Sequence, residues 1–470
     1  MRVLVVGGGA REHAIAYALR QSEATVVTVA KNQNPGLSSL SSAYHVVEPT
    51  QADAVVRVAQ GSQVDYAVIG PEAPLVAGVA DALRAAGIPV VGPDRRGAQI
   101  ESSKYFCRDL LERHHIDAAP RHATVQKGDD VLGRLKEFPQ PFVIKPDGIT
   151  AGKGVWVQGP DFTTIEEGAA YVQRLFSEGS GQERVVLEEK LEGEEFSLMA
   201  FVTDSGVYPM PAVQDFKRAL EGDQGPNTGG MGSYSQRDHL LPFLSVAMRD
   251  QALGVIRQTA DALKQDGIQY RGILYGGFML TAQGPRLLEF NARFGDPEAV
   301  NVLTLYEEGN FADLLHGVAL GRVDPNLLRF RLRATVVKYL VPPGYGTDPR
   351  PGGILDLDTT SIQAEGVGIR YGSVDAVAPG HVRLTTSRGV ALVGEASAIW
   401  EAGVRVEAAL QFVRGEYYVR HDIGSRADLT KRTEHVRHLF APGSKPSPIP
   451  LSVAPPDAAP SSAGDATQVI

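Results

Sequence analysis

The first hundred residues alternate between short apolar runs and amphipathic stretches, and this alternation is what most constrains the fold. Residues 3–6 form a continuous apolar run, as expected of a buried parallel strand. Further strands are expected at residues 25–30, 65–69 and 88–91, with one helix beginning near residue 11 and another over residues 75–86. Such alternation predicts an α/β domain built on a doubly wound parallel sheet.

The turn after the first strand, Gly7-Gly8-Gly9, carries part of a dinucleotide-binding motif but departs from it twice. Glu12 stands where the third glycine is required, and Lys31 stands where a ribose-binding acid would follow the second strand. The free N–H groups at a helix start still suit a single phosphate, to which Arg11 could add positive charge. We therefore favour a sugar-phosphate site here over a purely structural tight turn.

A second rigid turn, GPEAP at residues 70–74, ends the strand at residues 65–69. Glu72 in this turn could accept hydrogen bonds from ribose hydroxyls. It could equally favour the N-terminus of the helix that follows, because carboxylates are stabilised there.

A glycine-rich loop lies between two predicted strands in the middle of the chain. The strand at residues 142–145 ends in Lys145, the loop PDGITAGKG spans residues 146–154, and a strand returns at residues 155–157. The loop is not a Walker loop, because Gly148 and Gly152 are one residue too close and Gly154 replaces the metal-binding hydroxyl residue. A strand-end lysine beneath a glycine loop is closer to the phosphate lid of a kinase, although a bare glycine hairpin has the same pattern.

An acidic turn follows the strand predicted at residues 185–187. Its sequence is EEKLEGEE, residues 188–195, and it leads into a strand at residues 195–203. A hinge of this kind can bind an adenine edge through backbone amides and a ribose through a carboxylate. An acidic surface turn is the alternative, and the glycine loop upstream favours the hinge.

Residues 214–232, QDFKRALEGDQGPNTGGMG, contain five glycines and one proline. This composition predicts either an ordered functional loop or a disordered one. Asp215 and Lys217 lie near its start. Asn227-Thr228-Gly229-Gly230 lies near its end, where exposed glycine amides can form an anion site.

The stretch RLLEFNARFGDPE, residues 286–298, begins as a strand and becomes crowded with polar side chains. Glu289 and Asn291 are two residues apart, so an extended chain directs both to one face. Two oxygen donors on one face can bind a hard cation such as Mg²⁺ against phosphate oxygens. Arg293 is expected on the same face, where its guanidinium could contact a phosphoryl group. A salt-bridged edge strand is the simpler alternative.

Composition narrows the class of protein. A chain of 470 residues is long enough for about three domains, and its formal net charge of −9 argues against general binding to nucleic acid or membranes. Cys107 is the single cysteine, which leaves no disulfide framework and no thiolate zinc cluster. The sequence has no apolar run of about 18 residues and begins with a strand, so a cytoplasmic enzyme is expected.

In their order along the chain, these motifs resemble those of the phosphoribosylamine–glycine ligase family, within the ATP-grasp superfamily. The resemblance covers about residues 1–425 and is carried most specifically by PNTGGMG and RFGDPE. It implies ATP-dependent ligation of glycine to 5-phosphoribosylamine in purine synthesis, giving glycinamide ribonucleotide, ADP and phosphate through glycyl phosphate. The alternatives are another ATP-grasp ligase, a carboxylase-like enzyme using bicarbonate, and a nucleotide sensor without turnover.

The resemblance also implies an α/β organisation. It places an N-terminal doubly wound domain at residues 1–103, an ATP-grasp unit at residues 104–325 with a small lid subdomain at about residues 121–192, and a C-terminal α/β domain at residues 326–435. In this last domain, strands are expected at residues 333–340 and 390–394 and a helix at residues 396–413. Residues 436–470 are rich in proline, serine and alanine, which predicts a disordered tail. A monomer whose partners are its small-molecule substrates is expected.

The resemblance assigns roles to residues that match the family's motifs. The implied ATP-binding residues are Lys104, Lys145, Gly152, Lys153, Gly154, Glu188, Glu189, Leu191 and Glu195. The implied substrate-binding residues are Gly9, Arg11, Glu12, Pro71, Glu72, Asn227, Thr228, Gly229 and Gly230. Glu289 and Asn291 would bind Mg²⁺ or Mn²⁺, and Asp215, Lys217 and Arg293 would form the catalytic group.

The sequence departs from the family pattern at four points. Ala299 and Val300 follow RFGDPE where relatives usually carry a polar pair. Phe216 stands where bacterial relatives usually have histidine, so a histidine at this position cannot be a required acid or base. Ala292 replaces the usual cysteine. The strand GILYGGFML, residues 272–280, carries no acid, so metal binding rests on Glu289 and Asn291.

Overall fold

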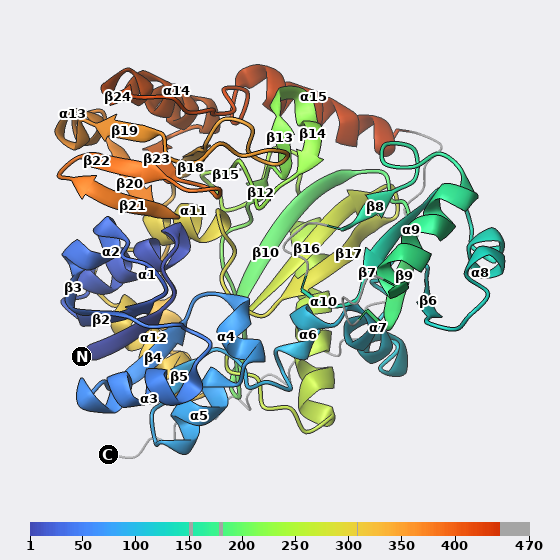
Figure 1. Cartoon of the computed structure of the whole chain (residues 1–470), viewed down its shortest axis with the longest axis horizontal. Coiled ribbons are helices and arrows are strands. Elements are labelled where there is room, and N and C mark those ends of the chain that lie inside the picture. The colour runs from blue at the N-terminus through green and yellow to red at the C-terminus, as the bar shows by residue number, and fades with distance from the viewer. Residues whose placement is uncertain (150–153, 178–181, 308, 442–470) are drawn as a thin grey trace, which may run out of the picture.

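The computed structural model describes residues 1–149, 154–177, 182–307 and 309–441, and all statements below concern these residues. An N-terminal sheet domain and a C-terminal domain lie one above the other, a long central sheet lies beside them, and a small lobe forms the far side (Figure 1). No helix in these ranges is both long and apolar enough to cross a membrane.

The N-terminal sheet has five parallel strands in the order β3-β2-β1-β4-β5, which confirms the doubly wound prediction. The central strand β1 (Arg2–Val6) is fully buried from Val3 onward, as its apolar run predicts. The helix predicted at residues 75–86 is instead two short helices, because Gly78 between them adopts a left-handed φ of +82°. The other elements are β2 (Thr25–Ala30), β3 (Ser41–Val46), β4 (Tyr66–Ile69), β5 (Val90–Val91), α1 (Ala10–Gln21), α2 (Pro35–Leu40), α3 (Ala52–Gly61), α4 (Glu72–Val76) and α5 (Val79–Ala85).

The small lobe, which we call the lid, has an antiparallel sheet in the order β6-β9-β7-β8 and a hydrophobic core of its own. Two short helices, α6 (Gln99–Ser102) and α7 (Lys104–Arg113), precede it, and Ser103 caps α7 by accepting a hydrogen bond from the Phe106 amide. Because its core is separate, the lid is packed as a unit distinct from the rest of the chain. Its elements are β6 (His122–Gln126), α8 (Val131–Glu137), β7 (Phe142–Pro146), β8 (Trp156–Val157), α9 (Ile165–Ser177) and β9 (Arg184–Glu189).

The central sheet is antiparallel, in the order β11-β10-β16-β17. Register is regular except near the end of β17, where Gly277 pairs with Glu289 and Phe278 pairs with Leu287. Leu288 is therefore the extra residue of a β-bulge, which leaves its backbone groups outside the ladder. The elements are β10 (Glu194–Thr203), β11 (Gly206–Pro209), α10 (Val246–Gln265), β16 (Gly272–Thr281) and β17 (Gly284–Asn291).

The glycine-rich residues 214–232 are ordered, which agrees with the ordered alternative and excludes the disordered one, although part of the segment is strand rather than loop. They supply an edge strand, β12 (Gln214–Asp215), and a hairpin of β13 (Arg218–Leu220) and β14 (Gln224–Asn227) around the turn Glu221–Asp223. Glycines at positive φ, Gly222 (+68°) and Gly225 (+77°), allow this tight turn.

The C-terminal domain shares a sheet with this segment, so the predicted boundary at residue 325 does not separate two units. Strand β15 (Gly232–Ser235) pairs with β18 (Ala334–Leu340) in the sheet β12-β15-β18-β23-β20. The helix predicted at residues 396–413 is shorter, since β23 (Val390–Ala396) continues to residue 396. The remaining elements are β19 (Ile354–Leu357), α13 (Thr359–Ala364), β20 (Val367–Tyr371), β21 (Val374–Ala378), β22 (His381–Leu384), α14 (Ile399–Ala409) and β24 (Val413–Arg414).

Three further helices join the parts. Helices α11 (Glu298–Leu305) and α12 (Phe311–Ala319) belong to the predicted ATP-grasp range but pack on the N-terminal domain, where the Tyr66 hydroxyl donates to the Ala312 carbonyl at 2.9 Å. Helix α15 (Arg426–Leu439) returns over the central sheet (Figure 1). It runs past residue 435, so the predicted tail does not begin at residue 436; residues 442–470 lie outside the described ranges.

Candidate active site

Lys145, at the end of β7, is held by buried groups. Its Nζ lies 2.6 Å from Glu188 Oε2 on β9 and donates to the Leu288 carbonyl at 3.2 Å. Glu188 is also paired with Arg108 of α7 at 2.6 Å, and Arg108 donates to the same Leu288 carbonyl at 2.8 Å. Burial alone would raise the pKa of Glu188, but Arg108 and Lys145 bring it below its ordinary value. This ionised triad carries one net positive charge and joins the lid to β17.

Lys104 lies at the start of α7 and donates to the Gly148 carbonyl at 2.8 Å. Burial, opposed by the Glu289 carboxylate, lowers the pKa of Lys104. The structure thus brings Lys104 and the start of the glycine loop together. Gly154 accepts a hydrogen bond from the Tyr171 hydroxyl at 2.7 Å, whereas Gly152 and Lys153 lie outside the described residues.

Glu289 and Asn291 lie on one face of β17, opposite Gly277 and Tyr275 of β16, as their spacing predicts. Glu289 has no hydrogen bond or ion pair with any described residue, yet its pKa lies below the ordinary value. Burial would raise that pKa, and the charges of Lys217, Lys145, Lys104 and Arg293 lower it. An ionised carboxylate surrounded by lysines is suited to bind a cation between itself and an anionic ligand.

Asp215, Lys217 and Glu195 form the opposite side of this charged region. Lys217 Nζ lies 2.9 Å from Glu195 Oε2 and 3.9 Å from Asp215 Oδ2. The Glu195 carboxylate, expected to bind ribose, is therefore paired with lysine here. Burial and the neighbouring Glu298 raise the pKa of Asp215 to about 7, although Lys217 opposes this shift.

A buried hydrogen-bond chain lies behind Asp215. The hydroxyls of Ser197 and Tyr275 are 2.7 Å apart, and Tyr275 donates to Glu298 Oε1 at 2.8 Å. Ser197 also donates to Asp215 Oδ1 at 3.4 Å. Glu298, only 3% exposed, brings negative charge close to Asp215, which explains part of the raised pKa.

The segment from Asn227 to Gly230 is fixed by its own backbone and by the C-terminal domain. Thr228 donates to the Lys217 carbonyl from both its amide (2.7 Å) and its hydroxyl (2.8 Å). Arg388, from the loop before β23, donates to the carbonyls of Gly229 (2.6 Å) and Asp296 (2.7 Å). Arg388 thus joins the two most specific motifs of the sequence.

The glycine turn of the N-terminal domain is occupied by a protein carboxylate. Glu12 accepts from the Gly9 amide at 2.6 Å and from Arg11 Nε at 2.5 Å, and it is 2% exposed. The sequence suggested that the Gly9 N–H is free to bind a phosphate. In this structure it is instead bonded to Glu12. A Cβ on Gly9 would lie 2.9 Å from the Glu12 carboxylate, so a larger residue here would require the Glu12 side chain to move.

Arg293 lies beyond the end of β17, so strand alternation does not place it with Glu289. It pairs with Glu72 of the second turn at 3.2 Å and with Glu101 of α6 at 2.9 Å, and it donates to Asn291 Oδ1 at 3.3 Å. Burial would lower the pKa of Arg293, but the carboxylates of Glu101 and Glu72 raise it above its ordinary value, so the guanidinium stays charged on the N-terminal side of the site. Pro71 is the N-cap residue of the helix that begins with Glu72.

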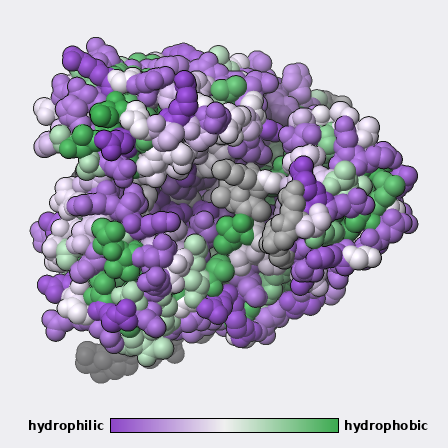
Figure 2. Space-filling model, in the orientation of Figure 1, coloured by the Kyte–Doolittle hydropathy of each residue, from purple (hydrophilic) through white to green (hydrophobic). Residues whose placement is uncertain are grey.

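The hinge at residues 188–195 connects the lid to the central sheet. Glu189 accepts a hydrogen bond from the Arg121 amide at 2.9 Å, at the other end of the lid. Leu191 is half-buried between the two lobes. Figure 2 shows a mostly hydrophilic surface that is hollowed between the lid and the N- and C-terminal sheets.

Sequence reasoning missed several residues of this region: Glu101, Arg108, Tyr275, Glu298 and Arg388. Arg108 and Glu101 flank Lys104 in the sequence, and a charged residue among the apolar positions of a helix could have signalled Arg108. Arg388 lies in a loop without any motif. In the described ranges no three His, Cys, Asp or Glu side chains cluster as metal ligands.

Two family models match the chain. They are the phosphoribosylglycinamide synthetase N domain, over residues 1–101, and the ATP-grasp (A) domain of the same synthetase, over residues 102–299. The chain belongs to the phosphoribosylglycinamide synthetase family. A phosphoribosylamine–glycine ligase of Methanocella arvoryzae is 43% identical over 439 residues, which is 93% of this chain and 99% of the relative. That of Pyrococcus abyssi is 41% identical over 94% of this chain and 100% of the relative.

Solved structures agree with membership of the phosphoribosylglycinamide synthetase family. The phosphoribosylamine–glycine ligase of Thermotoga maritima has a TM-score of 0.75 at 26% identity, covering 90% of this chain and 100% of that one. The biotin carboxylase domain of Hydrogenobacter thermophilus 2-oxoglutarate carboxylase has a TM-score of 0.69 at 14% identity, covering 93% of this chain and 98% of that one. At this identity the second match shows only the shared ATP-grasp fold.

Proposed function

We propose that this ATP-dependent ligase joins glycine to 5-phosphoribosylamine, giving glycinamide ribonucleotide, ADP and phosphate, through glycyl phosphate. The observation that supports this most is Glu289, an ionised carboxylate among Lys104, Lys145 and Lys217 without a protein partner in the described residues. Lysines at this density suit the phosphates of ATP, and the carboxylate suits their cation.

The residues present fit Mg²⁺ or Mn²⁺ bound together with a nucleotide. Glu289 and the Asn291 amide oxygen would supply the protein ligands. Two protein ligands are enough because Mg²⁺ in nucleotide sites takes its other ligands from phosphates and water. A bound cation supplies charge neutralisation at the phosphates.

The reaction needs activation because a glycine carboxylate has no good leaving group. A carboxylate oxygen attacks the γ-phosphorus of ATP, the bond to ADP breaks, and an acyl phosphate forms. The amine of phosphoribosylamine then attacks the acyl carbon, phosphate leaves, and the nitrogen loses a proton. Lys145, held by Glu188, lies in this region and would stabilise the charge of the transferred phosphoryl group. The lid would exclude water, which otherwise hydrolyses the acyl phosphate.

We assign Asp215 to the glycine side of the site, where its ionised form would hold the glycine ammonium or accept the proton released by the amine. The groups that face it are Lys217, Glu195, Glu289, Glu298, Ser197 and Tyr275. Both roles require the charged carboxylate. Activity should therefore depend on pH near the pKa of about 7 given above.

We expect kcat/KM for glycine to fall as pH is lowered through about 7, because Asp215 becomes protonated, and to approach tenfold per pH unit on the acid side. The measurement is a pH profile of ADP release at saturating ATP. Asp215→Asn should lower activity and remove this acid limb. An unchanged limb in Asp215→Asn would assign the titration to another group.

The proposed intermediate is tested with glycine labelled with oxygen-18 in its carboxylate. Glycine, phosphoribosylamine and ATP are incubated with the protein, and the released phosphate is analysed by mass spectrometry. One labelled oxygen should pass into each phosphate, since the departing phosphate keeps the bridging glycine oxygen when the C–O bond of the acyl phosphate breaks. Product formed with unlabelled phosphate would refute the glycyl phosphate route.

An assay of ADP release separates the alternatives. A carboxylase-like enzyme would release ADP with bicarbonate in place of glycine, and a nucleotide sensor would show no steady ADP release.

We further propose that the protein acts as a monomer in the cytoplasm, without nucleic-acid or membrane partners. The net charge of −9 supports the absence of these partners.

A further inference from the structure

The catalytic side of the site is built from alternate residues of two strand segments. Glu195 of β10 and Asp215 and Lys217 of the β12 segment face the charged region described above. Their sequence neighbours Glu194, Gln214 and Phe216 must point the other way, because side chains alternate along extended chain. Gln214 Nε2 donates to Glu194 Oε2 at 3.3 Å on this opposite side, which we call the back face.

Helix α15 covers the back face through one arginine. Arg432 lies 2.8 Å from Glu194 Oε2, 2.8 Å from Asp223 Oδ2 and 2.9 Å from Asp428 Oδ1, and it is 8% exposed. His435, one turn later, lies 2.7 Å from the other oxygen of Glu194. A single guanidinium thus joins β10, the turn of the β13–β14 hairpin and its own helix.

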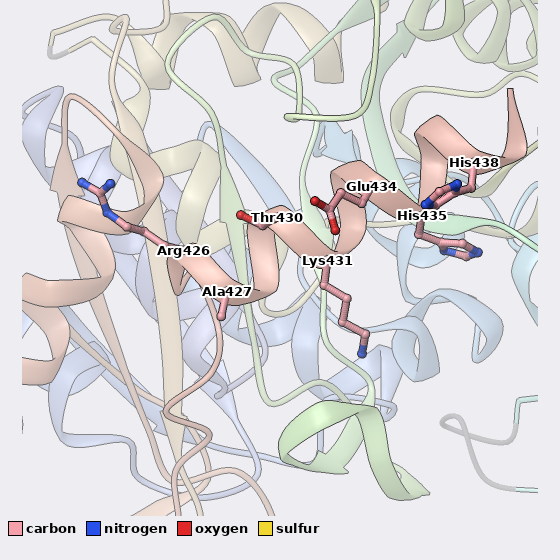
Figure 3. A pocket seen from close by; sticks show the side chains of 7 residues that line it. All are labelled: Arg426, Ala427, Thr430, Lys431, Glu434, His435 and His438. Carbon is pink, nitrogen blue, oxygen red and sulfur yellow. The ribbon is translucent and has the colours of Figure 1, made fainter. Parts of the chain in front are cut away.

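The outward side of α15 is a shallow exposed groove lined by seven residues (Figure 3). Lys431 and Glu434 in this groove are exposed, and neither has an ion pair with a described residue. The helix therefore has a buried side directed at the back face and an outward side on which Lys431 and Glu434 form no ion pair within the described chain. Lys431 and Arg432 are adjacent in sequence but differ in environment.

Phe216 connects the arginine to the catalytic segment. Its ring is 1% exposed and lies close to two guanidinium groups, Arg432 at 4.5 Å and Arg420 at 5.0 Å from the ring centroid. Stacking on guanidinium suits an aromatic ring, which explains how phenylalanine replaces the usual histidine here. Because Phe216 lies between Asp215 and Lys217, fixing its ring fixes the backbone from which both side chains project.

We propose that Arg432 is a positioning residue for the glycine side of the active site, acting from the back face through Phe216 and Glu194. Displacement of residues 215–217 by a fraction of an ångström would change the Asp215–Lys217–Glu195 geometry. Small misplacements of this kind reduce catalysis strongly, since binding groups must be held in a defined geometry. The inference rests on the proposed function, which places glycine beside Asp215.

The test compares Arg432→Met with Lys431→Met in the full-length protein. Both substitutions remove one positive charge from α15, but only the first removes contacts with the back face. We expect KM for glycine to rise about tenfold in Arg432→Met and to stay unchanged in Lys431→Met. Affinity for an ATP analogue, measured by titration, should change less than about threefold because Lys104 and Lys145 are untouched. KM does not depend on what fraction of the enzyme is folded, so a loss of folded protein alone would not raise it.

Arg432→Lys should give an intermediate KM, because it keeps the charge but cannot contact three carboxylates at once. This variant also provides the comparison with Lys431→Met if Arg432→Met does not fold. An unchanged KM for glycine in the folded Arg432 variants, or an equal rise in Lys431→Met, would overturn the proposal. Failure of the proposed function would appear separately, as ADP release by the unmodified protein that does not depend on glycine.

Discussion

Replacing Glu289 by glutamine is expected to lower Mg²⁺-dependent turnover at least about a hundredfold, the scale for one preorganised electrostatic group. Glutamine keeps the shape but removes the charge that the nearby lysines stabilise. Nucleotide binding should persist, because Lys104 and Lys145 remain and the loss of one negative charge leaves more positive charge for phosphate. Steady-state ADP release at several Mg²⁺ concentrations, with titration of an ATP analogue, measures both effects.

A matched control for this experiment is Glu192→Gln. Glu192 is exposed in the hinge, and its neutralisation should leave turnover within about twofold. Turnover by Glu289→Gln close to that of the unmodified protein at saturating Mg²⁺ would remove Glu289 from the metal site. Equal losses in both variants would point to a general effect of acidic residues near the hinge.

The second large effect is expected for Lys145→Met, which should lower kcat by about a hundred- to a thousandfold. Methionine fills similar space but leaves Glu188 without its lysine, so the charge of the buried triad changes from one positive to none. The phosphoryl group would then lose the positive charge that Lys145 contributes during transfer. Single-turnover measurement of ADP formation at saturating ATP separates this loss from weaker ATP binding.

Lys127→Met serves as the control for Lys145→Met, because it removes an exposed lysine of the same lobe whose partner Glu183 is also exposed. Its turnover should be close to normal, as exposed ion pairs contribute little. A second comparison is Arg108→Met, which should also reduce activity because Glu188 would then neutralise Lys145. If Lys145→Met kept more than a tenth of normal kcat, Lys145 would have no direct role in phosphoryl transfer.

Local patterns in the sequence are enough to predict the N-terminal sheet and the polar end of β17. The apolar runs at residues 3–6 and 25–30 form neighbouring parallel strands, since such runs are stable only when buried on both sides. Glu289 and Asn291 share a face because strand periodicity alone decides it. Lys145 at a strand end and the hinge at residues 188–195 are likewise local features.

The features that local sequence patterns could not predict depend on contacts between distant segments of the chain. The bulge at Leu288 depends on the pairing of β16 with β17, and it frees the carbonyl that Arg108 and Lys145 contact. Arg388 and Glu101 meet their partners only after three parts of the chain have packed together. Glycine-rich composition left both an ordered loop and a disordered one open at residues 214–232, and strand pairing with β15 and within the hairpin decides for order.

The sheet that spans the predicted boundary at residue 325 has a consequence for how the gene could be divided. A chain interrupted between α12 and β18 would leave β12 and β15 in one fragment and β18, β23 and β20 in the other. Each fragment would expose an unpaired strand edge complementary to the other, and Arg432 would again meet Glu194 across the gap. Two polypeptides made separately could therefore reassemble into one enzyme. Each half alone would expose its unpaired strand edge to solvent.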